Sequence, residues 1–272
     1  MCDALVEITI PNSVVSVGSY AIGSPKLTSI TIPNSVTTIG DNAFKNCKNL
    51  TAFYGKFASN DNRCLIVDGV INSFARAGLT TYTIPNNVTS IGAEAFGGSE
   101  LQGVVIPNSV KEIGENAFSD SNSLLRVDIP SSVISIGYGA FSYCDNLNSV
   151  TISNSVTAIG DYAFCGCVNL QEITMPNSIT AIGNSVFHSC SSLPSITIPQ
   201  SVVSIRERAF LGCSDLMSVY CLPTTPPAGA KDMFVSGSTL LKIYVDTKCL
   251  GIYKRAPYWR NYDFYLTDHD FS

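Results

Sequence analysis

A 23-residue spacing of leucines runs through most of this 272-residue chain. The residues around each leucine recur as well, as in LTSITIPNSVTTIGDNAFKNCKN over residues 27–49. A fixed period of about 20–29 residues built on Leu and Ile is the pattern of a leucine-rich-repeat solenoid, in which similar units stack along one axis. The clearest series is Leu101, Leu124, Leu147, Leu170, Leu193 and Leu216.

A single unit shows how such a repeat would bury its apolar side chains. Two short apolar groups alternate with polar residues, as strands do, and an Ala-Phe-x-x-Cys group follows them. One unit cannot enclose all of these side chains, whereas stacked neighbours can. In the unit that begins at residue 147 the inward residues are Leu147, Val150, Ile152, Val156, Ile159, Ala163, Phe164 and Cys167.

Stacking of these units predicts one domain over residues 1–272, a right-handed solenoid of about ten units. Every unit repeats the same strand direction, so we expect a parallel β-sheet on one face, with turns and short helical segments on the other. Strands about 4.8 Å apart would make ten units roughly 50 Å long.

Two small motifs are predicted to shape the turns. A Pro-Asn pair, as at Pro33-Asn34, ends the first strand, and its Asn tolerates a left-handed conformation. A glycine after the second apolar group predicts either a positive φ or close packing. This glycine is present at Gly18, Gly40, Gly92, Gly114, Gly137, Gly160 and Gly183.

Two segments depart from the 23-residue period. In the first, about residues 55–78, two apolar runs flank Asp68-Gly69, which predicts a β-hairpin in place of the usual turn. The second, about residues 217–272, is predicted to be a degraded repeat with Phe234 at the Phe position, then one last strand, LLKIYV. Its Tyr-rich tail around Trp259 is expected to cover the end of the stack.

The cysteines admit structural, disulfide and metal interpretations. Ser99 and Ser121 occupy the same position of the repeat as the cysteines of five units, which favours a small buried position with a free thiol. A zinc site would need paired cysteines at short spacing, and Cys165 and Cys167 are the only close pair. The five repeat cysteines are Cys47, Cys144, Cys167, Cys190 and Cys213; the pairing of Cys2, Cys64, Cys221 and Cys249 stays open.

The composition argues against several functional classes. Charged residues make up only 14% of the chain, and the net charge of -5 includes no basic block, so no nucleic-acid partner is expected. No apolar run is long enough to span a membrane. Motifs of zinc proteases, serine hydrolases and phosphate loops are missing, and His188 lies at a variable position that is expected to be a solvated turn. We therefore predict no catalytic residue, no metal and no cofactor.

The repeat sequence SITIPNSVTTIGDNAF, with its Phe-x-x-Cys group, resembles the BspA-type leucine-rich repeats of bacterial surface proteins. The segments GKFASNDNRCLIVDGVINSFARAGLTTYTIP and KIYVDTKCLGIYKRAPYWRNY also resemble the hairpin insertion and C-terminal cap of such proteins. The resemblance implies an exported or surface-anchored protein that is not an enzyme, and in some members an adhesin. Localisation at the cell surface or in the medium is expected on this ground alone.

The start of the chain lies inside a repeat, because Cys2 precedes Leu5 by the same three residues that separate Cys47 from Leu50. We expect either a fragment of a longer protein or a natural start whose apolar end is covered by a partner.

Candidate binding residues come from the second and fourth positions after each repeat leucine, which should face outward on the sheet. Most are Ser or Thr, which also stack well between strands for purely structural reasons. The expected exceptions are Tyr220, Lys242 and Tyr244 near the C-terminal end, with Arg126, Asp128, Tyr54 and Glu172 elsewhere.

The favoured function is a non-catalytic cell-surface protein that binds a protein or glycan ligand, chiefly at Tyr220, Lys242 and Tyr244. Two alternatives stay open. The two Tyr rings could instead pack against the tail near Trp259, and the whole chain could be a passive spacer within a larger exported protein.

Overall fold

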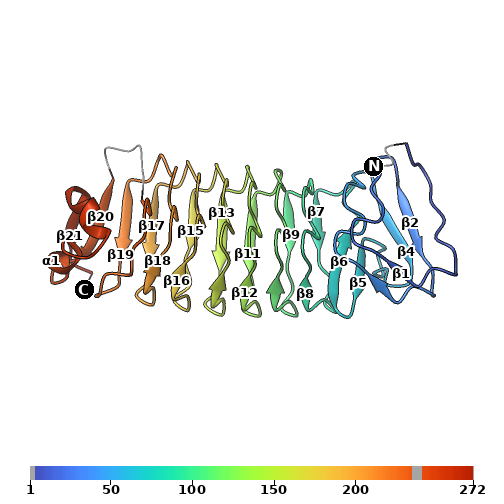
Figure 1. The fold of residues 1–272 in the computed structure, drawn as a ribbon, viewed down its shortest axis with the longest axis horizontal. Helices are drawn as coiled ribbons and strands as arrows, with labels where there is room; N and C mark the ends of the chain where they lie inside the picture. The colour runs from blue at the N-terminus through green and yellow to red at the C-terminus, as the bar shows by residue number, and fades with distance from the viewer. Residues whose placement is uncertain (1–3, 235–240, 272) are drawn as a thin grey trace.

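The computed structural model describes residues 4–234 and 241–271. The chain forms an elongated solenoid of about 11 turns, with its strands side by side along the long axis (Figure 1). This confirms the leucine-rich-repeat solenoid with parallel sheets that the 23-residue period predicts.

The strands that follow the repeat leucines form the first column of the solenoid. In β11 (Arg126–Ile129), Val127 and Ile129 are buried while Arg126 and Asp128 are exposed. Most neighbouring strands of this column pair in parallel; between β11 and β13, for example, Arg126 lies opposite Ser149. The other strands of this column are β2 (Ser29–Ile32), β4 (Ala52–Gly55), β7 (Thr81–Thr83), β9 (Gly103–Val105), β13 (Ser149–Ile152), β15 (Glu172–Thr174), β17 (Ser195–Ile198), β19 (Ser218–Cys221), β20 (Lys242–Asp246) and β21 (Leu266–His269).

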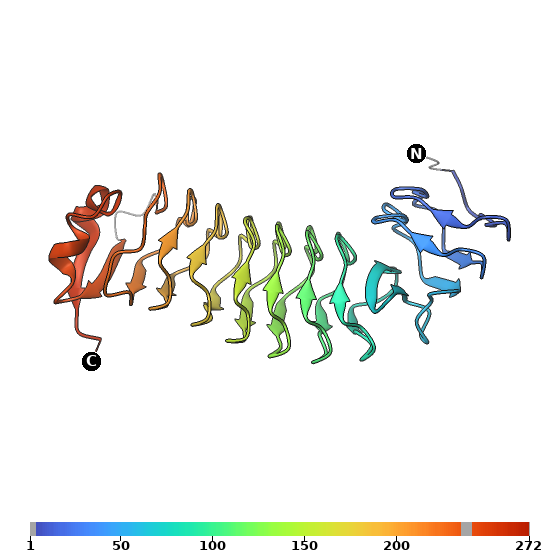
Figure 2. The same ribbon diagram turned by 60° about the horizontal axis from the view of Figure 1, so that its bottom comes forward.

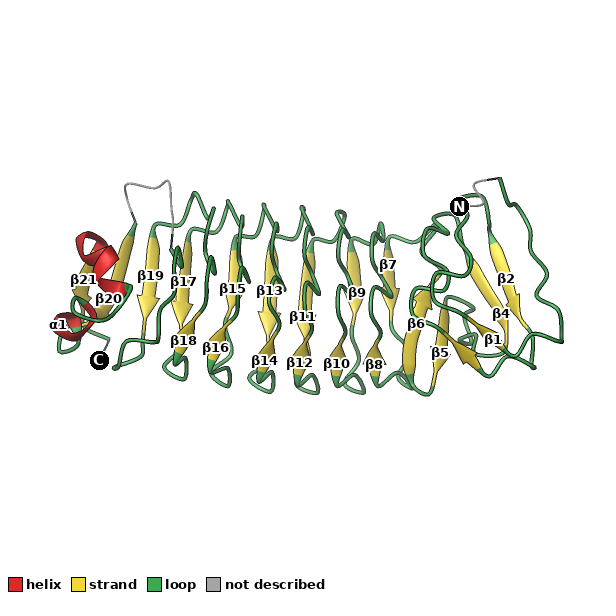
Figure 3. Cartoon of the chain, viewed as in Figure 1, coloured by secondary structure: helices red, strands yellow, loops and turns green. Residues whose placement is uncertain are grey.

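The second apolar group of each unit forms a second column of short strands. Turns join the two columns, and among the described residues helix occurs only in α1 (Leu250–Tyr253) and the 3-10 helix η1 (Trp259–Tyr265) (Figure 3). The opposite side of the solenoid therefore has short strands and turns where short helical segments were expected. The second column comprises β1 (Ser16–Val17), β3 (Thr38–Ile39), β6 (Val70–Phe74), β8 (Ser90–Ile91), β10 (Glu112–Ile113), β12 (Ser135–Ile136), β14 (Ala158–Ile159), β16 (Ala181–Ile182) and β18 (Ser204–Ile205).

A stack of phenylalanine rings forms the centre of the core. Successive ring centroids lie between 4.5 Å and 5.8 Å apart, and most pairs are nearly parallel. The stack ends on the fully buried Trp259, whose Nε1 donates a hydrogen bond to the carbonyl of Pro227 at 2.7 Å. The Tyr-rich tail thus packs against the last turn, and it adds one unexpected parallel strand, β21. The stacked rings are Phe74, Phe96, Phe118, Phe141, Phe164, Phe187, Phe210 and Phe234.

Close packing explains the repeated glycine in six of the seven units. A Cβ at Gly160 would lie 2.5 Å from the backbone nitrogen of Tyr138, and none of the seven glycines at this position has a positive φ. Positive φ occurs instead two residues before and two after the Phe, as at Asn116 (50°) and Asp120 (58°). The asparagines of the Pro-Asn pairs have no positive φ, so the prediction of a left-handed conformation at these residues was wrong.

The repeat cysteines serve as hydrogen-bond donors within the core. The thiol of Cys144 donates to the carbonyl of Phe118 at 3.1 Å, and the Ser121 hydroxyl makes the equivalent bond to Phe96 at 3.0 Å. This shared bond explains why Cys and Ser alternate at one position. All nine described cysteines are free and buried, as predicted for the repeat cysteines, while Cys2 lies outside the described residues.

The predicted hairpin is confirmed by the antiparallel pair β5 (Cys64–Val67) and β6, joined at Asp68 and Gly69 with φ of 50° and 81°. Its second strand, β6, pairs in parallel with β8 and so takes the second-column position of its unit. After Ile71, which pairs with Ile91 of β8, only seven residues (72–78) lead to the next repeat leucine. In a regular unit the same connection has ten residues, as in 114–123. The segment 72–78 is therefore too short to form the usual Phe-bearing turn.

The hairpin divides the solenoid into two parts, visible as an offset in Figure 2. We call β1–β4 the short stack and β6–β21 the long stack; β4 does not pair with β7, nor β3 with β6. The buried residues correspondingly form two clusters. Side chains of the hairpin contribute to both, because Leu65 belongs to the core of the short stack and Cys64 and Ile71 to that of the long stack.

Candidate functional site

The outward face of the first column is small and uniform over most of its length. Along β13 and β15, for example, the exposed positions include Thr151 and Thr174, which lie side by side. Short hydroxyl side chains on adjacent parallel strands offer hydrogen bonds but little contact area.

An aromatic group breaks this pattern at the C-terminal end of the same face. Tyr220 of β19 and Tyr244 of β20 are opposite each other in the register, with ring centroids 5.0 Å apart and planes 11° apart. Lys242 is exposed one row away, opposite Ser218. His269 of β21 meets the edge of both rings, at 6.1 Å from Tyr220 and 5.5 Å from Tyr244.

The structure therefore brings together three of the residues singled out from the sequence and adds a fourth. The Tyr rings do not pack against Trp259, which is buried inside the core beneath Phe234 and Tyr253. We name Tyr220, Lys242, Tyr244 and His269 the aromatic patch. His269 could not be predicted from the repeat, because β21 lacks the leucine spacing of the other strands.

The other candidate residues lie apart from this patch. Arg126 and Asp128 form an exposed bidentate ion pair on β11, with Nη2 and Oδ1 2.9 Å apart. The hydrogen bonds from Arg126 lower the pKa of the Asp128 carboxyl. Glu172 is two strands away in the same row as Arg126, and Tyr54 lies in the short stack. The two paired charges largely neutralise each other, so they offer little to a ligand.

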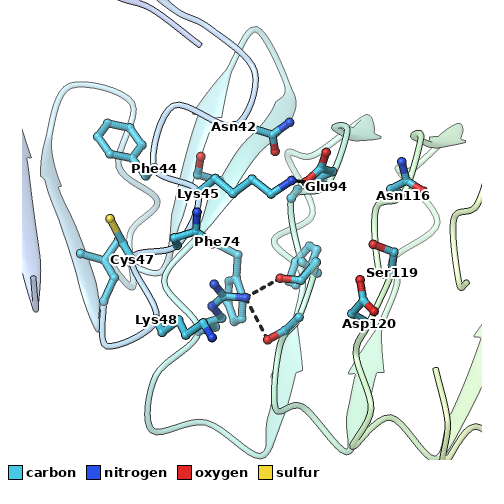
Figure 4. Close-up of a pocket in the computed structure, with 18 of the residues that line it drawn as sticks. Asn42, Phe44, Lys45, Cys47, Lys48, Phe74, Glu94, Asn116, Ser119 and Asp120 are labelled. Atoms are coloured by element: carbon cyan, nitrogen blue, oxygen red, sulfur yellow. Dashed lines mark hydrogen bonds and ion pairs between the residues drawn. The ribbon is translucent and has the colours of Figure 1, made fainter. Parts of the chain in front are cut away.

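A cavity of about 660 Å³ lies between the two stacks, on the side of the Phe-bearing turns (Figure 4). Asn72 and Phe74 of β6 line it, together with the turn around Phe44 on one side and the turn around Phe96 on the other. Lys45 of the short stack reaches across to form an ion pair with Glu94 of the long stack. We call this space the junction cavity.

Arg76 is the most constrained polar residue of the junction cavity. Its Nη1 donates hydrogen bonds to the carbonyls of Gly97 at 2.5 Å and Gly98 at 2.9 Å. Burial lowers the pKa of its guanidinium, although the group stays charged at neutral pH. The sequence did not single out this cavity, because it depends on a turn that is not formed.

On the other side of the hairpin a second cavity, of about 720 Å³, is bounded by Phe57, Ile66 and Pro85. Asp61 lies at its edge, where burial opposes its ionisation but hydrogen bonds from Ser59, Arg63 and Tyr82 outweigh that effect and lower its pKa. These polar groups hold the loop before β5 in place.

Outside these sites, Cys64 and His188 are side chains of the kinds that take part in catalysis or metal binding. Burial raises the pKa of the Cys64 thiol to about 12, which keeps it protonated and unreactive. His188 is half-buried rather than solvated, and its Nδ1 lies 2.7 Å from the Ser189 hydroxyl. Among residues 4–234 and 241–271 no cluster of His, Cys, Asp and Glu could hold a metal ion, and no helix is long and apolar enough to cross a membrane.

The sequence matches the family described as the BspA type leucine rich repeat region, in six copies over residues 1–60, 71–158 and 135–258. The chain belongs to this family. The gap between the first two matched ranges, residues 61–70, falls on the hairpin insertion. BspA-type repeat proteins are generally non-catalytic. No curated protein matches this chain significantly.

Solved structures show the same fold. A leucine-rich repeat protein from Eubacterium ventriosum is 27% identical, with a TM-score of 0.59; the match covers 75% of this chain and 63% of that protein. One from Bacteroides ovatus is 24% identical, with a TM-score of 0.61, covering 99% and 79%. The pneumococcal vaccine antigen PcpA is 18% identical, with a TM-score of 0.55, covering 94% and 69%. This BspA-type chain thus spans less than two thirds of the Eubacterium protein.

Proposed function

We propose that this chain is a non-catalytic binding module of a bacterial cell-surface or secreted protein, and that it holds a protein or glycan ligand at the aromatic patch. The observation that carries the proposal is the stacked pair Tyr220 and Tyr244, half-exposed on a face that otherwise presents mainly short polar side chains.

The chemistry of the patch supports this function. Tyr rings provide a large contact area and lose little conformational entropy on binding, and Tyr is enriched at the centres of binding interfaces. The stacked pair presents ring surface and two phenol groups, and Lys242 adds a cationic donor beside them. His269 supports both rings from the side and so limits their motion before a ligand arrives.

A location at the cell surface is part of the same proposal. It is supported by membership of the BspA-type family and by the likeness to a fold that also occurs in a pneumococcal vaccine antigen. Treating intact cells of the source bacterium with protease, followed by detection of this chain with an antibody, tests it. Digestion only after lysis would contradict it.

The binding test compares two double variants on the same face. Tyr220→Ala with Tyr244→Ala should abolish capture by immobilised host matrix proteins and glycans. Thr151→Ala with Thr174→Ala should leave capture unchanged, because these exposed residues lie on the uniform part of the sheet. The melting temperature of both variants should stay close to that of the wild type.

A passive spacer is the competing function. The uniform Ser and Thr surface and the self-neutralised pair of Arg126 and Asp128 favour it, since neither selects a ligand. Absence of wild-type binding to the whole panel, or equal binding by the two double variants, would support the spacer and contradict the aromatic patch.

A further inference from the structure

The Phe-bearing turns form a ridge along the long stack, held together by a repeating set of backbone hydrogen bonds. In a typical turn, the N–H groups of the Phe and of the residues two before and two after it donate to three carbonyls of the next turn. In one turn these are Asn116 to Tyr138 at 2.8 Å, Phe118 to Ala140 at 2.8 Å and Asp120 to Ser142 at 2.9 Å. Each turn therefore offers donors on one side and acceptors on the other.

This ridge is interrupted at the junction cavity, because residues 72–78 are too few to form a turn. On the wall of the short stack, three N–H groups have no hydrogen-bond partner among the described residues: Asn42, Phe44 and Asn46. On the facing wall, the carbonyls of Ala93 and Ala95 likewise accept no hydrogen bond from the described part of the chain. The cavity thus has a row of donors on one wall and a row of acceptors on the other.

Arg76 supplies a hydrogen bond to one carbonyl of the acceptor row. The carbonyl of Gly97 is the third acceptor of that wall, equivalent to Ser119, which accepts from Gly98. With no turn to supply an N–H group, Arg76 donates to Gly97 with its guanidinium. A side chain therefore replaces one of the three missing donors, and two positions stay open.

The charges of the junction cavity indicate which side chain an occupant should carry. Lys45 and Glu94 pair with each other. Lys48 is exposed on the rim, and neither it nor Arg76 forms an ion pair with another described residue. Counting Asp120, the lining carries three cationic and two anionic side chains, a net charge of +1. An acidic group beside Lys48 and Arg76 fits best.

We propose that the junction cavity binds a short peptide segment of a protein partner, which completes the interrupted ridge. The carbonyls of the segment accept from the wall of the short stack, and its N–H groups donate to Ala93 and Ala95, as in strand addition at a sheet edge. A carboxylate of the segment lies against Lys48 and Arg76. The volume of about 660 Å³ is within the usual range of ligand sites, about 300–1,000 Å³. This site is independent of the aromatic patch.

A displayed library of random decapeptides, selected on the purified chain, provides the probe. Enriched peptides should share an Asp or Glu. Hydrogen exchange of residues 42–47 should slow when a synthesised peptide of the enriched sequence is added, because open N–H groups become bonded. Residues 116–120, whose turn is already bonded, should exchange at an unchanged rate. Failure to enrich any peptide, or protection elsewhere on the chain, would overturn the proposal.

Two charge variants complete the test. Lys48→Glu should weaken peptide binding by up to about fivefold, the upper size of one exposed ion pair. Lys111→Glu, a matched change at an exposed lysine outside the cavity, should leave binding unaltered. Equal effects of the two variants would mean general charge attraction, and loss of binding in the Tyr220→Ala, Tyr244→Ala variant would mean that the peptide occupies the aromatic patch. Either result contradicts the junction cavity as a peptide site.

Discussion

The short and long stacks are built from the same kind of repeat but differ in how much each unit is supported. In the long stack, eight rings pack one above another, with pairs such as Phe118 and Phe141 at 5.1 Å and 2°. In the short stack, Phe44 meets only Phe53, edge-on at 5.5 Å and 63°. Neighbours on both sides, rather than the sequence of one unit, determine how well a repeat is buried.

This comparison predicts unequal stability. In a stack where each unit contacts only its neighbours, stability is close to a sum of unit and interface contributions. The short stack has fewer interfaces and a separate core, so it should open locally before the long stack does. Measuring the unfolding of each stack separately also tests whether the whole chain unfolds as a single domain.

The largest expected difference appears at alkaline pH. Burial raises the pKa of Cys64, Cys144, Cys213 and Cys221 to about 12, and all four side chains belong to the core cluster of the long stack. An unfolded thiol has a pKa of about 8.5, so the unfolded state loses protons between about pH 8.5 and 12 while the folded state keeps them. Their stabilising contribution is complete below about pH 8.5 and falls by up to about 1.4 kcal/mol per pH unit for each thiol, or about 5 kcal/mol for four.

Urea unfolding at pH 8, 9 and 10, followed by fluorescence of the single, buried Trp259, measures this loss in the long stack. The control is Cys144→Ser with Cys213→Ser, which keeps the hydrogen bond that Ser121 already makes. It should lower the slope by about a third, because burial also raises the pKa of Cys167 and Cys190, so two of six such thiols are removed. An unchanged slope in the control would mean that groups other than these thiols cause the loss.

The next largest effect contrasts two phenylalanines. Phe164→Ala should destabilise the long stack by about 3–5 kcal/mol, because rings on both sides hold the gap open. Phe44→Ala should cost less, since Phe44 has one aromatic neighbour and borders the junction cavity. Hydrogen exchange read by mass spectrometry localises each effect. Equal losses, or a loss confined to units remote from the substitution, would contradict the two-stack comparison.

A smaller difference is expected at the repeated glycine. Gly160→Ala places a methyl group 2.5 Å from the nitrogen of Tyr138 and should cost about 1–3 kcal/mol. Gly18→Ala meets no atom within 4 Å and should be neutral or slightly stabilising, because alanine restricts the unfolded chain. Unfolding midpoints of the two variants decide this, and a comparable cost at Gly18 would refute close packing as the reason for the glycine.

Periodicity explains why so much of the fold could be predicted from the sequence. A position that recurs every 23 residues has the same neighbours each time, so the inward Leu, Phe and Cys positions and the outward Tyr220 and Tyr244 follow from spacing alone. The hairpin followed from its turn residues, Asp68 and Gly69.

The remaining features depend on breaks in the period. The segment from Leu50 to Leu79 is six residues longer than a regular unit, which reveals an insertion. It does not reveal that β6 would take a second-column position and leave a turn unformed, so the junction cavity and the role of Arg76 were missed. The place of His269 was missed because β21 pairs without the repeat leucine.

The smallest expected effect concerns a second interruption, inside the long stack. The residue after each repeat leucine donates its N–H group to the preceding unit, as Gln171 does to Asn148 at 2.9 Å. Pro194 has no N–H group, and β15 and β17 are not paired in the sheet. Pro194→Gln should add one hydrogen bond worth about 1 kcal/mol, partly offset because proline restricts the unfolded chain by about 0.4–1 kcal/mol.

We therefore expect a gain below about 1 kcal/mol for Pro194→Gln and slower hydrogen exchange over residues 193–198. The core cluster is continuous across this break, whereas it is divided at the hairpin. A missing backbone bond alone should therefore matter far less than a missing turn. A loss of stability, or faster exchange over these residues, would show that the fixed φ of Pro194 stabilises this unit more than the added bond could.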